Sequence, residues 1–101
     1  MRAIAINCTL KRSPERSNTD ALLDIVLGAL VREGVETDTI RAVDHVIAPG
    51  VSSDEGDGDE WPALRERILA AEILVMASPT WLGQQSSVCK RVLERMDAML
   101  S

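Results

Sequence analysis

The segment of residues 9–19 combines the side-chain types that bind a phosphate group. It holds four hydroxyls, one amide and three cations, and these three are among only eleven Lys and Arg residues in a chain of net charge −5. Residues 17–20 match the [ST]-x-x-[DE] pattern that starts a helix. The first N–H groups of a helix lack intrahelical acceptors and lie at its positive end, so this segment predicts a phosphomonoester site. The alternative is a capped helix with solvated cations.

A second polar segment, residues 78–83, follows the apolar run 73–77. Trp81 could stack on a flat heteroaromatic ring, and Gly83 would let the backbone approach that ring closely. The alternative is that Trp81 packs against Trp61 or the last helix. This segment predicts a second contact with the same ligand.

The sequence gives little support for a nucleotide-binding loop, a metal site or a catalytic residue. The chain has neither the G-x-x-x-x-G-K-[ST] motif nor the G-x-G-x-x-G motif of nucleotide-binding loops. The acidic run 54–60 lacks the residue order of a calcium loop, which favours a solvated loop over a metal site. The sequence shows no arrangement of Ser, Cys or carboxylate residues that would make His45 a general base. Cys8 and Cys89 lack the spacing of metal ligands and are expected to stay reduced. We predict no catalytic residue and no metal site.

The apolar pattern predicts an α/β chain in the order β-α-β-α-β-α. Expected strands and helices alternate at residues 3–6, 22–31 (after the cap at 17–20), 35–40, 62–71, 73–77 and from 86 onward. Parallel strands joined by helices form a doubly wound sheet, which binds ligands at the carboxyl ends of its strands. Residues 73–77 are apolar enough for a central strand but would lie at the edge of a three-stranded sheet. Either the chain is a fragment, which we favour, or it dimerises to cover that edge.

Charged residues on the last helix have a plainer interpretation. Lys90 and Glu94 are four residues apart, as are Arg91 and Arg95, which predicts a solvated helix face. The alternative for Glu94 and Arg95 is contact with a neighbouring subunit.

Composition limits the class of protein. With 46% apolar residues, 101 residues can form one core, so we expect a single domain over residues 1–101. The acidic balance and the lack of Phe and Tyr argue against nucleic-acid binding. No apolar run reaches the ~20 residues that span a bilayer, and no signal peptide is evident, so we expect a cytoplasmic protein without a membrane partner.

Two sequence segments resemble a known family. Residues 6–11 (INCTLK) with 17–19 (SNT) resemble the "NGSPR…GNT" loop of the NADPH-dependent FMN reductase family, within the flavodoxin-like superfamily. Residues 77–83 (ASPTWLG), with Lys90 and Glu94-Arg95, resemble its "(S/T)P-x-(Y/W)-x-(G/N)…K…(D/E)R" segment. The resemblance covers nearly the whole chain in the right order, but the family's last two strands and third flavin-contacting loop have no counterpart.

The resemblance implies a flavodoxin-like doubly wound parallel sheet, incomplete at its C-terminus, that binds FMN. The phosphate would be held by Thr9, Lys11, Ser17, Asn18 and Thr19, and the flavin ring would be lined by Pro79, Thr80, Trp81, Leu82 and Gly83. Two positions depart from the family pattern. Cys8 replaces a glycine, and Lys11 replaces an arginine, which removes a bidentate fork for phosphate.

The resemblance further implies an FMN-dependent NAD(P)H oxidoreductase of the flavin- or quinone-reductase type. NADPH or NADH would be the donor, a quinone or flavin the small-molecule acceptor, and the protein a homo-oligomer. One alternative is a flavodoxin-like electron carrier without a nicotinamide site, which would dock through residues 54–60. The other is a truncated, non-catalytic α/β domain that only self-associates.

Overall fold

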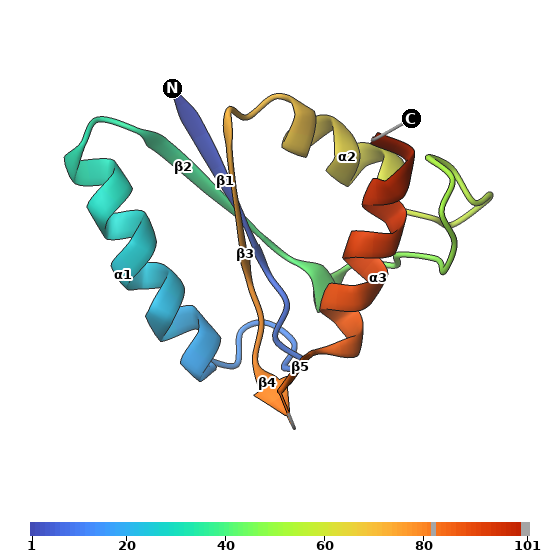
Figure 1. The fold of residues 1–101 in the computed structure, drawn as a ribbon, viewed down its shortest axis with the longest axis horizontal. Coiled ribbons are helices and arrows are strands. Elements are labelled where there is room, and N and C mark those ends of the chain that lie inside the picture. The colour runs from blue at the N-terminus through green and yellow to red at the C-terminus, as the bar shows by residue number, and fades with distance from the viewer. Residues whose placement is uncertain (82, 100–101) are drawn as a thin grey trace.

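Three parallel strands form the centre of the chain in a computed structural model. The structure describes residues 1–81 and 83–99, with the backbone alone at Trp81 and Ala98. The strands are β1 (Arg2–Asn7), β2 (Glu36–Arg41) and β3 (Ile73–Ala77), in the order β2-β1-β3. The predicted α/β class with a parallel sheet is confirmed, and β3 lies at the edge as expected (Figure 1).

Two of the three α-helices start at a side-chain cap, and the other starts at a proline. In α1 (Asn18–Arg32) the Ser17 hydroxyl accepts the Asp20 N–H and the Asp20 carboxylate accepts the Ser17 N–H, which confirms the predicted capping box. In α3 (Ser87–Arg95) the Ser86 hydroxyl accepts the Cys89 N–H. The third helix, α2 (Trp61–Leu69), has Pro62 in its first turn, where no N–H is needed. Short 3-10 helices follow β2 (Ala42–Asp44) and α3 (Met96–Met99).

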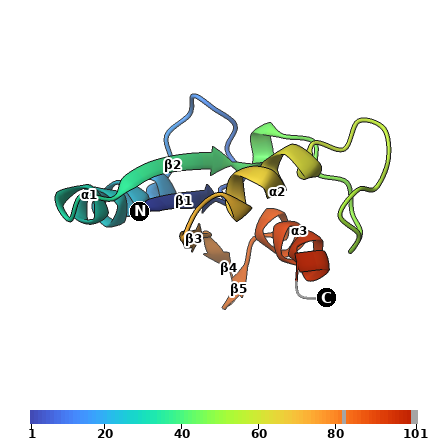
Figure 2. The same ribbon diagram turned by 90° about the horizontal axis from the view of Figure 1, so that it is seen from above.

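Helices cover the two faces of the sheet unequally. On one side α1 packs through Leu23 against Ala5 and Ala77. On the other side lie α2 and α3 (Figures 1 and 2). They enclose the larger core, which includes Ile4 and Ile6. Buried members of this core are Ile4, Ile6, Cys8, Ile40, Ala42, Ile47, Trp61, Leu64, Ile68, Cys89 and Val92. None of the helices in the described ranges is long and apolar enough to cross a membrane.

All three strands end at the same edge of the sheet. Asn7 of β1 is in register with Arg41 of β2 and with Ala77 of β3. The first loop (residues 8–17) and the second loop (residues 78–86) both start there, at the lower end of the sheet in Figure 1. The second loop is a small hairpin of β4 (Thr80–Trp81) and β5 (Gln84–Gln85), where only a turn was expected.

Arg95 corrects the prediction of a solvated face on the last helix. Its side chain is completely buried, and its Nη1 and Nη2 atoms lie 2.9 and 2.6 Å from the two carboxylate oxygens of Asp59. It also donates to the carbonyls of Ala48 at 2.8 Å and Ser52 at 3.1 Å, and its guanidinium lies 5.8 Å from the Trp61 ring centroid. Arg95 therefore contacts its own chain rather than solvent or a neighbouring subunit.

In the acidic loop (residues 45–60), residues 51–58 are exposed, as the prediction of a solvated loop has it, and Asp59 is the exception. The Asp59 side chain has no exposed surface, and its pKa lies well below the usual range because Arg95 donates to it. Arg95 is buried because of helical spacing. It follows Val92 by three residues and so lies on the buried face of α3. Its partner is 36 positions away in the sequence, beyond the reach of any local pattern.

Candidate functional site

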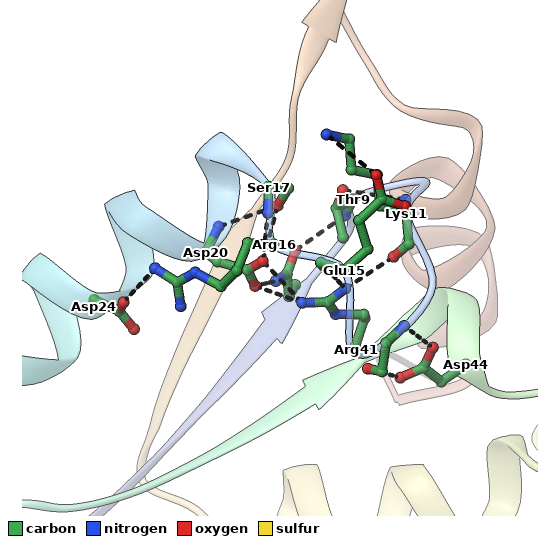
Figure 3. Close-up of polar contacts among 11 residues, drawn as sticks. Thr9, Lys11, Glu15, Arg16, Ser17, Asp20, Asp24, Arg41 and Asp44 are labelled. Atoms are coloured by element: carbon green, nitrogen blue, oxygen red, sulfur yellow. Dashed lines mark hydrogen bonds and ion pairs between the residues drawn. The ribbon is translucent and has the colours of Figure 1, made fainter.

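Arg41 connects the first loop to the start of α1. Its Nη2 atom lies 2.8 Å from each carboxylate oxygen of Asp20. Its Nη1 atom donates to the carbonyls of Glu15 at 2.6 Å and Lys11 at 3.1 Å (Figure 3). One side chain thus holds both arms of the loop, because the register of β2 brings Arg41 beside the end of β1.

Asp20 is the acceptor on which this network converges. Besides Arg41 it accepts the Asn7 side-chain amide at 2.6 Å and the Ser17 N–H at 2.7 Å. Burial opposes ionisation of this carboxyl, but the hydrogen bonds from Ser17 and the charge of Arg41 outweigh burial, so its pKa lies below the usual value. The carboxylate is ionised at neutral pH and its charge is balanced locally. It therefore does not cancel the positive end of α1.

The rest of the first loop is anchored at two further points. Thr9 is buried, its N–H donates to the Asn7 amide oxygen at 3.0 Å, and its hydroxyl accepts the Lys11 N–H at 3.3 Å. Ser13 donates through its N–H to Asp44 at 3.0 Å and through its hydroxyl to the same carboxylate. These bonds fix the loop before any ligand is present.

The five predicted phosphate residues occupy two places on this loop. Ser17, Asn18 and Thr19 form the cap and first turn of α1, and Thr9 and Lys11 lie at the start of the loop. The Ser17 hydroxyl is engaged with Asp20, whereas the Lys11 ammonium is half exposed and 3.8 Å from a Glu15 carboxylate oxygen. That these residues hold a phosphate stays a prediction.

Ser86 holds the second loop against the first. Its hydroxyl donates to the Cys8 carbonyl at 2.8 Å, and its N–H donates to the Ser78 hydroxyl at 2.9 Å. The Cys8 N–H in turn donates to the carbonyl of Ala77 at 2.8 Å. The two loops predicted to share a ligand are therefore joined at the end of β1.

The second-loop residues are only partly described. Pro79 is half-buried and Thr80 and Gly83 are exposed, with Gly83 at a φ of +77° that suits glycine. Leu82 lies outside the described residues, and Trp81 is described by its backbone alone. Ring stacking by Trp81 stays a prediction.

The two cysteines are free and buried in the larger core. Burial, with the neighbouring Cys89 thiol, raises the pKa of the Cys8 thiol. A buried thiol with a raised pKa is a poor nucleophile, so Cys8 is a packing residue.

Sequence reasoning missed Arg41, Asn7 and Asp44. Asn7 and Arg41 could have been identified from the register of β1 and β2. They are the last residues of these neighbouring parallel strands, at the edge where such sheets bind ligands. Asp44 carries no local signal, since its partner Ser13 is 31 positions away.

Comparisons with known proteins agree with this geometry. The sequence model of the family described as NADPH-dependent FMN reductase matches residues 1–101. A crystal structure of RosB with the bound intermediate 8-demethyl-8-formylriboflavin-5'-phosphate superposes with a TM-score of 0.87 at 36% identity, over 100% of this chain and 44% of that one. This likeness confirms the predicted flavodoxin-like class.

Two curated relatives are similar over nearly the whole chain. The divalent metal cation transporter MntH of Mycobacterium bovis is 53% identical over 105 residues, which is 100% of this chain and 15% of the relative. The 8-demethyl-8-aminoriboflavin-5'-phosphate synthase of Streptomyces davaonensis is 37% identical over 108 residues, which is 98% of this chain and 42% of the relative. The chain thus spans less than half of each relative.

Proposed function

Because the chain belongs to the NADPH-dependent FMN reductase family, we propose that it is the FMN-binding part of a flavin-dependent NAD(P)H oxidoreductase. The observation that carries the proposal is the anchored first loop: Arg41 and Asp20 neutralise each other and leave the N-terminus of α1 electropositive. RosB, whose bound intermediate is a flavin 5'-phosphate, supports the same ligand class.

The first loop suits the phosphate of FMN. Asn18 and Thr19 stand at the first two positions of α1, where N–H groups lack intrahelical acceptors. At the start of the first loop, the ammonium of Lys11 would add a positive charge and the hydroxyl of Thr9 a hydrogen-bond donor to the phosphate. A dianionic phosphate would be held by amides and one cation, with Ser17 serving mainly to fix the helix start.

The second loop suits the flavin ring. The second loop begins where β3 ends, and Ser86 near its end donates to the carbonyl of Cys8. Backbone N–H groups of this loop would hydrogen-bond the ring, and Trp81 would stack on it. FMN, when bound, would supply the redox chemistry, namely hydride acceptance from NADPH or NADH and electron transfer to a quinone or another flavin. The protein positions the ring, so no acid or base residue is required.

The test is a fluorescence titration of the purified chain with FMN and, as a control, riboflavin. We expect FMN to bind at least about tenfold more tightly, because only FMN carries the phosphate. Equal affinities would overturn the phosphate assignment. No binding of either ligand to the folded chain would overturn the proposal.

Hydride transfer is tested separately in stopped flow. The FMN-loaded chain, mixed with NADPH or NADH, should lose flavin absorbance in a single turnover. If FMN binds but neither nucleotide reduces it faster than free FMN, the electron-carrier alternative replaces the enzyme. We expect the protein in the cytoplasm, as a homo-oligomer.

A further inference from the structure

A cleft of about 340 Å³ lies beside the first loop, between the segment after β2 and the start of α3. It is lined by Arg12, Ala42, Val43, His45, Val46, Ile47, Ser87, Val88 and Arg91. None of the ten residues assigned to FMN is among them. Its volume falls in the range of small-molecule sites.

Two cations of an acidic chain meet at this cleft. Arg12 comes from the first loop and Arg91 from α3, and within residues 1–81 and 83–99 neither belongs to an ion pair. Among the other arginines of the described residues, six lie within ion-pair distance of a carboxylate and Arg32 does not. Arg12 and Arg91 therefore keep guanidinium donors for an anion, and Ser87 adds a hydroxyl in the first turn of α3.

The walls of the cleft are held in place. Ser13, next to Arg12, is bonded to Asp44, and the Val46 N–H donates to Glu60 at 2.6 Å. His45 lies 3.0 Å from the same Glu60 carboxylate. The cleft is thus preformed, which lowers the entropic cost of binding.

We propose that this cleft binds a phosphate monoester of a small organic molecule, at a site separate from FMN. A phosphate monoester carries a charge of about −1.5 to −2 at neutral pH, which matches two guanidinium groups better than a single carboxylate does. The aliphatic side chains of Val43, Val46 and Val88 would contact the organic part. The site does not depend on FMN, since the residues that form it are fixed within the chain itself.

The experiment is an NMR titration of the ¹⁵N-labelled chain with phenyl phosphate, with phenol as the uncharged control. We expect amide shifts to cluster at residues 42–47 and 87–91, and phenol to cause none. Saturating FMN should leave the phenyl phosphate affinity unchanged. Shifts confined to residues 9–19, or competition by FMN, would overturn the proposal because the ligand would then occupy the first loop.

Two charge variants distinguish a specific phosphate site from general electrostatic attraction of the anion to the protein. Arg91→Gln should weaken phenyl phosphate binding about tenfold or more, since it removes a charge-assisted hydrogen bond. Lys90→Gln removes the same charge from the adjacent exposed residue, which does not line the cleft, and should change the affinity less than about twofold. Equal losses in the two variants would overturn the proposal. Both variants should bind FMN like the parent chain.

Discussion

Arg95 and Asp59 form an ion pair without exposed surface, surrounded by the core residue Trp61 and two carbonyls. Removing one partner of such a pair leaves the other charge buried and uncompensated. We expect Arg95→Met to lower the free energy of unfolding by about 3–5 kcal/mol, measured by urea denaturation.

The double variant Arg95→Met, Asp59→Leu is the control for this prediction. It removes both charges and should be more stable than Arg95→Met alone, because apolar pairs replace buried ion pairs at little cost. If the double variant is the less stable of the two, the backbone N–H groups of Ala48, Glu55 and Trp61, which Asp59 accepts, contribute more to stability than the unpaired carboxylate costs.

The same pair predicts how stability depends on pH. Hydrogen bonds from Arg95 lower the folded-state pKa of Asp59 below that of an unfolded aspartate, ~3.9. The stabilisation is therefore complete above that value and is lost as pH falls further toward the folded pKa. We expect the free energy of unfolding to fall between about pH 4 and pH 2, with a shallower slope in the double variant. Identical slopes would show that other carboxylates carry the acid sensitivity.

In the ligand site, Arg41 neutralises a mostly buried carboxylate, as Arg95 does in the core. Arg41→Gln leaves the mostly buried Asp20 carboxylate next to the start of α1 without its counter-charge, and it frees both arms of the first loop. We expect at least about tenfold weaker FMN binding in the fluorescence titration.

Arg67→Gln is the matched control for Arg41→Gln. It breaks a more exposed pair with Asp38, a surface contact of small energetic effect, and involves neither loop. FMN affinity should be that of the parent chain. Equal losses in both variants would mean that Arg41 acts only through overall stability.

At the scale of elements, Ser86 serves both the start of α3 and the junction of the two loops. Ser86→Ala removes the cap of the Cys89 N–H and leaves the Cys8 carbonyl without its donor. We expect a loss of about 2 kcal/mol, seen as a lower midpoint of urea unfolding. Ser87→Ala, at the next and exposed position, should leave the midpoint nearly unchanged. A similar loss in Ser87→Ala would show that the effect does not depend on the hydrogen bonds of the Ser86 hydroxyl.

The elements were largely predictable because their signals are local. Ser17 with Asp20, and Pro62 in the first turn of α2, mark helix starts within four residues of sequence. The partners of Arg41 and Arg95 were not predictable in this way, since they lie 21 and 36 positions away. The alternation of side chains in β2 and the helical spacing in α3 predict on which face a residue lies. They do not predict which carboxylate it pairs with there.

At the scale of the whole molecule, β3 is an edge strand with an uncovered flank. Leu74 pairs in register with the buried Ile4, yet 38% of its surface is exposed. An edge strand presents unpaired N–H and C=O groups to any other strand.

We therefore expect the 101-residue chain, when it is produced by itself, to associate with copies of itself through β3, whereas a further strand would cover that edge in a longer chain. Sedimentation of the 11.0 kDa chain should give a mass that is a multiple of this value. Leu74→Lys places a charge on the edge strand and should shift the population toward the monomer, as charged edges do in natural sheets. Val31→Lys, on the exposed surface of α1 away from the strand edge, should not. A monomeric parent chain at high concentration would contradict the prediction, and an unaltered oligomer in Leu74→Lys would place the contact elsewhere.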